Sequence, residues 1–157
     1  MSEPGHEADR DELRQQNIRT FREVLHLMGT SRFAEACELL TDDVLCEWPY
    51  PPIPGLTEKA GRAVIRDMFT ARMGRNEDFN FTVLETYDLL DPNALIVEYR
   101  CDTHRRETGV PYQNKYIAVV RFRDGLVSFW REYLNTLLVA QLIPQEWGLP
   151  AGWQPAG

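Results

Sequence analysis

The stretch that decides the fold is YQNKYIAVVRFRDGLVSFWREYLN, which runs from Tyr112 to Asn135. The pair Asp124-Gly125 at its centre is the strongest short signal for a two-residue hairpin turn. On either side of this pair the pattern has the period of two that is typical of strands. We therefore predict a β-hairpin made of strands 112–123 and 126–135.

Upstream of this hairpin, the hydrophobic pattern changes from a helical period to a strand period. Apolar residues recur at helical spacing in three segments: 9–28, 31–40 and 61–73. Strand patterns occupy three further segments: 44–48, 79–89 and 94–104. Helices followed by a meander of antiparallel strands are typical of an α+β fold. We expect three N-terminal helices to pack on one face of a strongly curved, mostly antiparallel sheet and to leave a conical hollow.

The composition indicates a single globular domain. The chain has 157 residues, of which 43% are hydrophobic and 26% are charged, and this is enough to bury a core. We assign the domain to residues 13–143. An acidic N-terminal tail, 1–12, is expected before it, and a Pro/Gly/Trp-rich tail, 144–157, is expected after it.

Charge and cysteine usage argue against several classes of partner and cofactor. The 17 basic and 24 acidic residues give a net charge of −7, which disfavours nucleic acid as the main partner. No apolar run reaches the length of a membrane span, and no secretory pattern opens the chain, so we expect a cytoplasmic protein without a membrane partner. The three cysteines lack Cys-x-x-Cys spacing and the three histidines are scattered, so no metal site is expected. We therefore expect any catalysis to be general acid/base catalysis without a cofactor.

The last strand of the hairpin carries a candidate acid/base, Glu132. A regular two-residue hairpin places Glu132 opposite Ile117, among apolar neighbours that include Trp130. Burial would disfavour the carboxylate and raise its pKa toward the range that general acid/base catalysis near neutral pH requires. The alternative is a structural ion pair of Glu132 with Arg131 or Lys115 at the rim of a subunit.

Four ionisable residues alternate along strand 94–104: Glu98, Arg100, Asp102 and His104. If their face turns toward the hollow, Arg100 and Asp102 form a cation–carboxylate pair that polarises a substrate and shuttles a second proton opposite Glu132. If their face turns outward, the alternation is that of a solvated strand.

Aromatic residues beside the proline-rich segment 49–55 are candidates for substrate binding. Trp48 and Tyr50 either form the lip of a pocket that stacks on a flat ligand, or they plug the end of the core. We assign Trp130, His104 and Asn135 to the same pocket, where they would shape it or add hydrogen bonds.

Four segments together resemble the SnoaL-like branch of the nuclear transport factor 2 superfamily: 47–52 (EWPYPP), 61–65 (GRAVI), 116–125 (YIAVVRFRDG) and 130–135 (WREYLN). Within this branch the chain looks most like the phenazine-biosynthesis A/B-type proteins, from Leu13 to about Ile143. The resemblance implies a cone-shaped (cystatin-like) fold with three helices packed into the curved sheet. It also implies a homodimer formed through the outer face of that sheet.

Two groups within the superfamily suggest roles for particular residues. Glu132 matches the glutamate that serves as acid/base in the phenazine proteins, whereas the helix histidine used there falls near Met68. Arg100-Cys101-Asp102 and the acid at 132 look like the limonene epoxide hydrolase pattern. The Tyr and Asn that position water in that group fall at Leu45 and Glu47.

The leading prediction is a cofactor-independent isomerase, cyclase or dehydratase that acts on a small aromatic or polycyclic metabolite. Its catalytic residues would be Glu132, Asp102 and Arg100. The alternatives are a non-catalytic small-molecule-binding or assembly subunit, and an epoxide hydrolase of the limonene epoxide hydrolase type.

Overall fold

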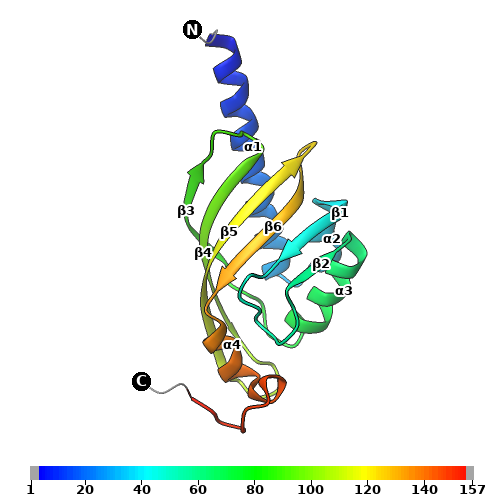
Figure 1. Cartoon of the computed structure of the whole chain (residues 1–157), viewed down its shortest axis with the longest axis vertical. Helices are drawn as coiled ribbons and strands as arrows, with labels where there is room; N and C mark the ends of the chain where they lie inside the picture. Colours follow the sequence, from blue (N-terminus) through cyan, green and yellow to red (C-terminus); the bar gives the residue numbers. More distant parts are fainter. Residues whose placement is uncertain (1–3, 155–157) are drawn as a thin grey trace.

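The computed structural model describes residues 4–154, in which helices pack against one curved sheet (Figure 1). The helices are α1 (Pro4–Gly29), α2 (Phe33–Glu38), α3 (Arg62–Met73), α4 (Thr136–Leu142) and the short 3-10 helix η1 (Pro144–Trp147). The strands are β1 (Leu40–Glu47), β2 (Glu58–Ala60), β3 (Thr82–Asp88), β4 (Ala94–His104), β5 (Pro111–Arg123) and β6 (Leu126–Leu134). Three helices precede the meander of long strands, and this confirms the α+β prediction.

The six strands form one sheet in the order β2-β1-β6-β5-β4-β3. Strand β1 runs parallel to β6, and the other neighbouring strands are antiparallel. In Figure 1 the long strands β4 and β5 bend along their length, and α1 passes across one face of the sheet. The strongly curved, mostly antiparallel sheet with helices on its inner face is therefore confirmed.

Two glycines allow backbone geometry that other residues would strain. Asp124 and Gly125 have φ angles of 54° and 77°, as a type I′ hairpin turn requires. Gly29 ends α1, and a Cβ atom there would lie 2.5 Å from the carbonyl oxygen of Phe79. The Phe79 amide donates to the Gly29 carbonyl at 2.8 Å, so this close approach fixes the segment before β3 against the end of α1.

The register of the β5–β6 hairpin differs from the regular one by a β-bulge. Arg123 pairs with Leu126 as predicted, but the pairing shifts by one residue after the next pair. Glu132 consequently pairs with Ala118, and the prediction that it would oppose Ile117 is wrong. A shift of one residue exchanges the two faces of the neighbouring strand, because side chains alternate along it.

The main core lies between α1 and the inner face of the sheet. Phe21, Val24 and Leu25 on α1 are at most 2% exposed, as are Val120 on β5 and Val127 on β6. Each such side chain contributes roughly 1.5–3 kcal/mol through burial. The core therefore holds the inner face of β5 and β6 toward the helices, and this decides which side chains can enter the hollow.

Element boundaries differ from the prediction in the segment after α2. That helix was expected to continue to about residue 40, but it ends at Glu38 and β1 begins at Leu40. The reason is that the Leu39 carbonyl accepts a hydrogen bond from the Val127 amide at 2.9 Å, so sheet pairing takes over. The short strand β2 was not predicted.

Both predicted tails contain regular structure within the described residues. Helix α1 begins at Pro4, inside the segment 1–12, whose first three residues lie outside the described part of the chain. The 3-10 helix η1 lies inside the segment 144–157. No helix of residues 4–154 combines the length and the apolar character needed to cross a membrane.

Candidate functional site

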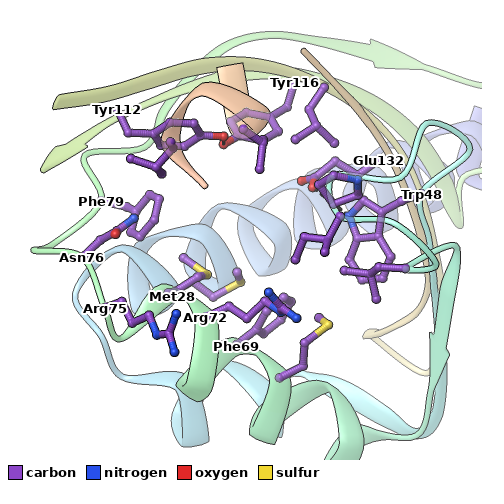
Figure 2. Close-up of a pocket in the computed structure, with 18 of the residues that line it drawn as sticks. Met28, Trp48, Phe69, Arg72, Arg75, Asn76, Phe79, Tyr112, Tyr116 and Glu132 are labelled. Carbon is purple, nitrogen blue, oxygen red and sulfur yellow. Dashed lines mark hydrogen bonds between the residues drawn. The ribbon is translucent and has the colours of Figure 1, made fainter. Parts of the chain in front are cut away.

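A cavity of about 380 Å³ lies between the inner face of the sheet and the helices (Figure 2). Its wall is mainly apolar and includes Met28 of α1, Phe69 of α3, Phe79, Leu134 of β6 and Val139 of α4. This volume falls within the roughly 300–1,000 Å³ range of small-molecule sites. The predicted hollow is thus present and has the size of a ligand.

Glu132 on β6 places its carboxylate at one end of this cavity. Its Oε1 accepts a hydrogen bond from the Tyr99 hydroxyl of β4, and its Oε2 accepts one from the Trp48 indole at 3.2 Å. Tyr99 is 1% exposed and Trp48 is 7% exposed, so packing fixes both donors. Each carboxylate oxygen has a second lone pair, which leaves acceptor capacity for a ligand.

The alternative of a structural ion pair for Glu132 is not observed. The Arg131 guanidinium instead pairs with Glu47 at 2.7 Å. Successive residues of a strand point to opposite faces, so Arg131 lies on the outer face while Glu132 lies on the inner one. The partners of the Glu132 carboxylate among the described residues are the two neutral donors.

Burial raises the pKa of Glu132 above its ordinary value of 4.5, because desolvation disfavours the charged form. The hydrogen bonds from Tyr99 and Trp48 act in the opposite direction, since they stabilise the carboxylate. The net shift is upward. Glu132 therefore gains and loses a proton at a higher pH than an exposed glutamate does, as a general acid/base requires.

Two further tyrosines on β5 extend the polar wall away from Glu132. The rings of Tyr99 and Tyr116 stack with centroids 4.9 Å apart, and the Tyr116 hydroxyl lies 3.4 Å from that of Tyr112. The Asn114 amide donates to the Tyr112 oxygen at 2.8 Å, so the Tyr112 proton remains available for donation. Burial raises the pKa of Tyr112 to about 12 and that of Tyr116 well above its usual range. Both phenols consequently stay protonated, and either hydroxyl could be the donor in the contact between them.

The end of the cavity across from Glu132 is cationic. Arg75, just after the end of α3, and Arg105, which follows β4, line this end, and Arg72 on the last turn of α3 lies nearer the middle of the cavity (Figure 2). Figure 2 shows Arg75 and Asn76 on the side of the cavity away from Glu132. The Arg105 guanidinium donates to Asn76 Oδ1 at 3.0 Å.

The C-terminal segment covers part of the cavity. Ile143 and Glu146 line the cavity, and Glu146 pairs with Arg72 at 2.8 Å. The Trp147 indole donates to the carbonyl of Pro52 in the proline-rich loop at 3.1 Å. Residues predicted as a C-terminal tail therefore complete the wall of the site.

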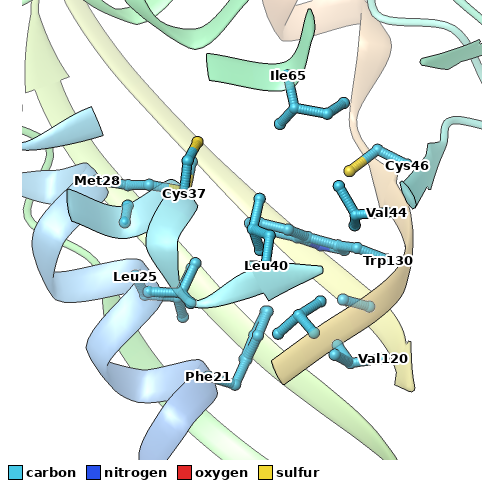
Figure 3. Close-up of a cluster of buried hydrophobic side chains, with 14 of the residues drawn as sticks. Phe21, Leu25, Met28, Cys37, Leu40, Val44, Cys46, Ile65, Val120 and Trp130 are labelled. Carbon is cyan, nitrogen blue, oxygen red and sulfur yellow. The ribbon is translucent and has the colours of Figure 1, made fainter. Parts of the chain in front are cut away.

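The structure places Trp48 and Trp130 in the cavity wall, where they were expected. Trp130 is 4% exposed and packs edge-on against Phe21 of α1, with ring centroids 5.1 Å apart. Figure 3 shows Trp130 within the buried cluster that also holds Phe21 and Leu40. Trp130 thus belongs to the core and the cavity at once, and it links the position of β6 to that of α1.

Tyr50 and Asn135, also assigned to the pocket, lie outside the cavity wall. Tyr50 is 64% exposed, and its ring packs against Tyr133 with a centroid distance of 6.1 Å. Asn135 caps α4, since its Oδ1 accepts a hydrogen bond from the Leu137 amide at 3.1 Å. Its polar side chain is explained by helix capping, which the sequence analysis overlooked.

Arg100, Asp102 and His104 point away from the cavity, and this corrects their predicted placement. The intervening residues Tyr99 and Cys101 are each 1% exposed and face the interior, so the alternating residues must face outward. The solvated-face alternative therefore describes these three residues, and the structure does not bring Arg100 or Asp102 together with Glu132.

Several cavity residues were missed by the sequence analysis: Tyr99, Tyr112, Tyr116, Arg72, Arg75 and Arg105. The tyrosines could have been found from strand alternation, because Tyr99 shares its face with Leu95 and Val97, which form an apolar core pattern. No local signal marks the arginines, which come from two segments about 30 residues apart in sequence.

A family model of the SnoaL-like domain matches residues 21–130 of the chain. The uncharacterized protein YesE of Bacillus subtilis (strain 168) is 32% identical over 122 residues, which are 78% of this chain and 83% of YesE. The uncharacterized PhzA/B-like protein PA3332 of Pseudomonas aeruginosa is 29% identical over 104 residues, which are 64% of this chain and 71% of that protein.

Solved structures with the same fold carry names that state several different activities. A Bacillus subtilis protein whose isomerase assignment is itself provisional aligns with a TM-score of 0.74 and 29% identity, over 89% of this chain and 96% of that one. A phenazine biosynthesis-related protein of Pseudomonas aeruginosa has a TM-score of 0.70 and 17% identity, over 95% and 96%. An epoxide hydrolase of M. tuberculosis has a TM-score of 0.64 and 19% identity, over 83% and 97%. The last two likenesses show the fold alone.

Proposed function

The chain belongs to the SnoaL-like domain family, and we propose that it is a cofactor-independent enzyme that performs acid/base chemistry on a small cyclic or aromatic metabolite. The observation that carries this proposal is the setting of Glu132. A single carboxyl group with a raised pKa is held by two buried donors at the end of an apolar cavity of ligand size. Isomerisation, cyclisation and dehydration all depend on proton transfer by such a group.

In the proposed reaction, ionised Glu132 removes a proton from a carbon next to a substrate carbonyl. The electron pair of the broken C–H bond forms an enolate, whose negative charge lies on the former carbonyl oxygen. A hydroxyl of Tyr112 or Tyr116 donates a hydrogen bond to this oxygen, because both phenols line the cavity and stay protonated.

Protonated Glu132 then returns its proton, and the destination decides the reaction. Delivery to a different carbon gives an isomer, and delivery to a leaving hydroxyl gives water and a dehydrated product. Tyr99 and Trp48 act as positioning residues, since they hold the carboxylate through both half-reactions. The apolar wall excludes water that would otherwise compete for the proton.

The proposal is tested by proton exchange, which does not require the natural substrate. The probe is 2-tetralone, a cyclic aromatic ketone, and deuterium incorporation next to its carbonyl in D₂O is followed by ¹H NMR. A positioned acid/base is worth roughly 10²–10⁴ in rate, so Glu132→Gln is expected to lose most of the exchange above the buffer rate. Glu47→Gln is the matched control, because Glu47 pairs with Arg131 on β6 and lies outside the cavity wall. Equal exchange by wild type, Glu132→Gln and buffer would refute the proposal.

A non-catalytic small-molecule-binding protein is the second candidate. The mainly apolar wall of the cavity would suit such a protein as well as it suits an enzyme. Under this alternative, Glu132→Gln binds 2-tetralone as wild type does, and neither protein accelerates exchange. The epoxide hydrolase alternative is not proposed, because Arg100 and Asp102 lie on the outer face of the sheet.

We also propose that two copies associate through the outer face of the sheet. Apolar side chains are exposed there, with Ile117 38% and Tyr87 44% accessible. Sedimentation equilibrium should give twice the chain mass, and Ile117→Glu should shift it toward the mass of one chain. The buried free thiols of Cys37, Cys46 and Cys101 support the proposal of a cytoplasmic, reducing location.

A further inference from the structure

The cationic end of the cavity is unusual in a chain with a net charge of −7. Three arginines line the cavity, Arg72, Arg75 and Arg105, and Glu146 is paired with Arg72. Within residues 4–154, neither Arg75 nor Arg105 has a carboxylate at ion-pair distance. Two guanidinium groups that line the cavity, one on the exposed Arg75 and one on the half-buried Arg105, are thus left without a protein counter-charge at close range.

Arg105 is held in place as a binding group would be. Its guanidinium donates to Asn76 Oδ1 at 3.0 Å, Asn76 is 4% exposed, and the Arg105 amide donates to the Val110 carbonyl at 2.9 Å. Burial lowers the pKa of Arg105, and the neighbouring charge of Arg75 lowers it further, while Glu107 and Glu146 act in the opposite direction. An anion between the two arginines would relieve this repulsion.

The local backbone favours a singly charged anion over a phosphate. Arg75 follows the C-terminal end of α3, which stops at Met73 with Gly74 as its cap. The C-terminal end of a helix carries partial negative charge, so it disfavours a dianion nearby. A guanidinium group offers a planar fork of donors, and the planar carboxylate group matches this fork.

We propose that the ligand of this cavity is a cyclic carboxylate whose carboxylate group is bound by Arg75 and Arg105, while its reacting carbon lies at Glu132. This inference rests on the proposed function, because it names the substrate class of the same cavity. Figure 2 shows Arg75 across the cavity from Glu132, with Met28, Phe69 and Arg72 in the middle part, and Arg72 is paired with Glu146. The apolar ring of the ligand occupies this middle part, and its negative charge is kept away from the carboxylate of Glu132.

The test compares an acid with its uncharged amide in calorimetric titrations at constant ionic strength. The probes are 2-naphthoate, 2-naphthamide and 2-naphthyl phosphate, which share one ring system and differ in the polar group. Wild type should bind the acid at least roughly tenfold more tightly than the amide, as expected for a charge-assisted contact. Arg75→Gln should remove most of this preference and leave the amide affinity unchanged. The matched control is Arg66→Gln on the same helix, since Arg66 pairs with the exposed Asp67 and does not line the cavity.

Each outcome decides between the two proposals. Equal affinity of wild type for the acid and the amide overturns the carboxylate inference but leaves a cavity that binds cyclic molecules, as the proposed function requires. Tighter binding of the phosphate than of the carboxylate overturns the choice of a singly charged ligand. Binding of none of the three probes overturns both proposals. The comparison of acid and amide uses wild type alone, so it does not depend on the folding of any variant.

Discussion

Replacing Tyr99 by phenylalanine removes the hydroxyl that donates to Glu132 Oε1 and keeps the ring that stacks on Tyr116. The donor on Trp48 remains, so the carboxylate retains one of its two hydrogen bonds. A hydrogen bond to a charged group contributes roughly 1.5–3 kcal/mol, and one pKa unit corresponds to about 1.4 kcal/mol. Tyr99→Phe therefore removes roughly 1.5–3 kcal/mol of stabilisation from the charged form, and it is expected to raise the Glu132 pKa further, in the same direction as burial.

The assay is ¹³C NMR of protein labelled at the glutamate side-chain carboxyl carbon, titrated from acidic to mildly alkaline pH. Glu132→Gln identifies the Glu132 resonance by its absence. Tyr87→Phe is the matched control, because it removes a tyrosine–glutamate hydrogen bond of 3.2 Å, to Glu98, on the outer face of the sheet. The control should leave the Glu132 pKa unchanged. An unchanged or lowered Glu132 pKa in Tyr99→Phe would refute the view that the hydroxyl stabilises the ionised carboxylate.

Three further predictions follow from burial. Folding raises the pKa of Glu132 above 4.5, so the stability of wild type relative to Glu132→Gln should be constant below pH 4.5 and fall as pH rises from 4.5 through the folded-state pKa; urea titrations in which this stability difference does not change with pH would contradict this. Burial raises the pKa of Cys37 and Cys101 to about 11, so both thiols should react slowly with Ellman's reagent in the native protein and rapidly once it is unfolded, and fast native reaction would disprove their burial. Ile65→Ala, at a fully buried position, should lower the free energy of unfolding by about 2–5 kcal/mol, whereas Val64→Ala, where the side chain is 48% exposed, should cost far less; similar losses in urea melts would argue against the core as described.

Local patterns were sufficient to predict most of the fold. The turn at Asp124-Gly125, the helix end at Gly29 and the alternation along 94–104 each depend on neighbouring residues, and each is found in the structure. Trp48 and Trp130 line the cavity as expected, since tryptophan is highly buried on average and both residues lie at or beside apolar strands.

The composition of the site depends on features that no local pattern reveals. The bulge in β6 has no marker in the local sequence pattern, and it moves Glu132 from the row of Ile117 to that of Ala118. Glu132 reached the interior all the same, because Trp130 and Leu134 on its own strand share its face.

The face of β4 could not be decided from polarity, since both faces carry residues capable of chemistry. Arg100 and Asp102 looked like a catalytic pair, yet Tyr99 and Cys101 occupy the interior. The arginine cluster brings α3 together with the loop after β4, and the cover of the cavity comes from η1 at the other end of the chain. Contacts of this kind are set by tertiary packing and not by sequence spacing.

The most direct test of the central claim is the pH dependence of deuterium exchange into 2-tetralone, measured beside the NMR titration of Glu132. If ionised Glu132 is the base, the rate above the buffer background should rise with pH, with a midpoint at the Glu132 pKa, above 4.5. Tyr99→Phe should move the kinetic midpoint and the NMR midpoint upward together. A kinetic midpoint that differs from the Glu132 pKa, or that stays in place while the pKa moves, would contradict the assignment of Glu132 as the proton-transfer residue.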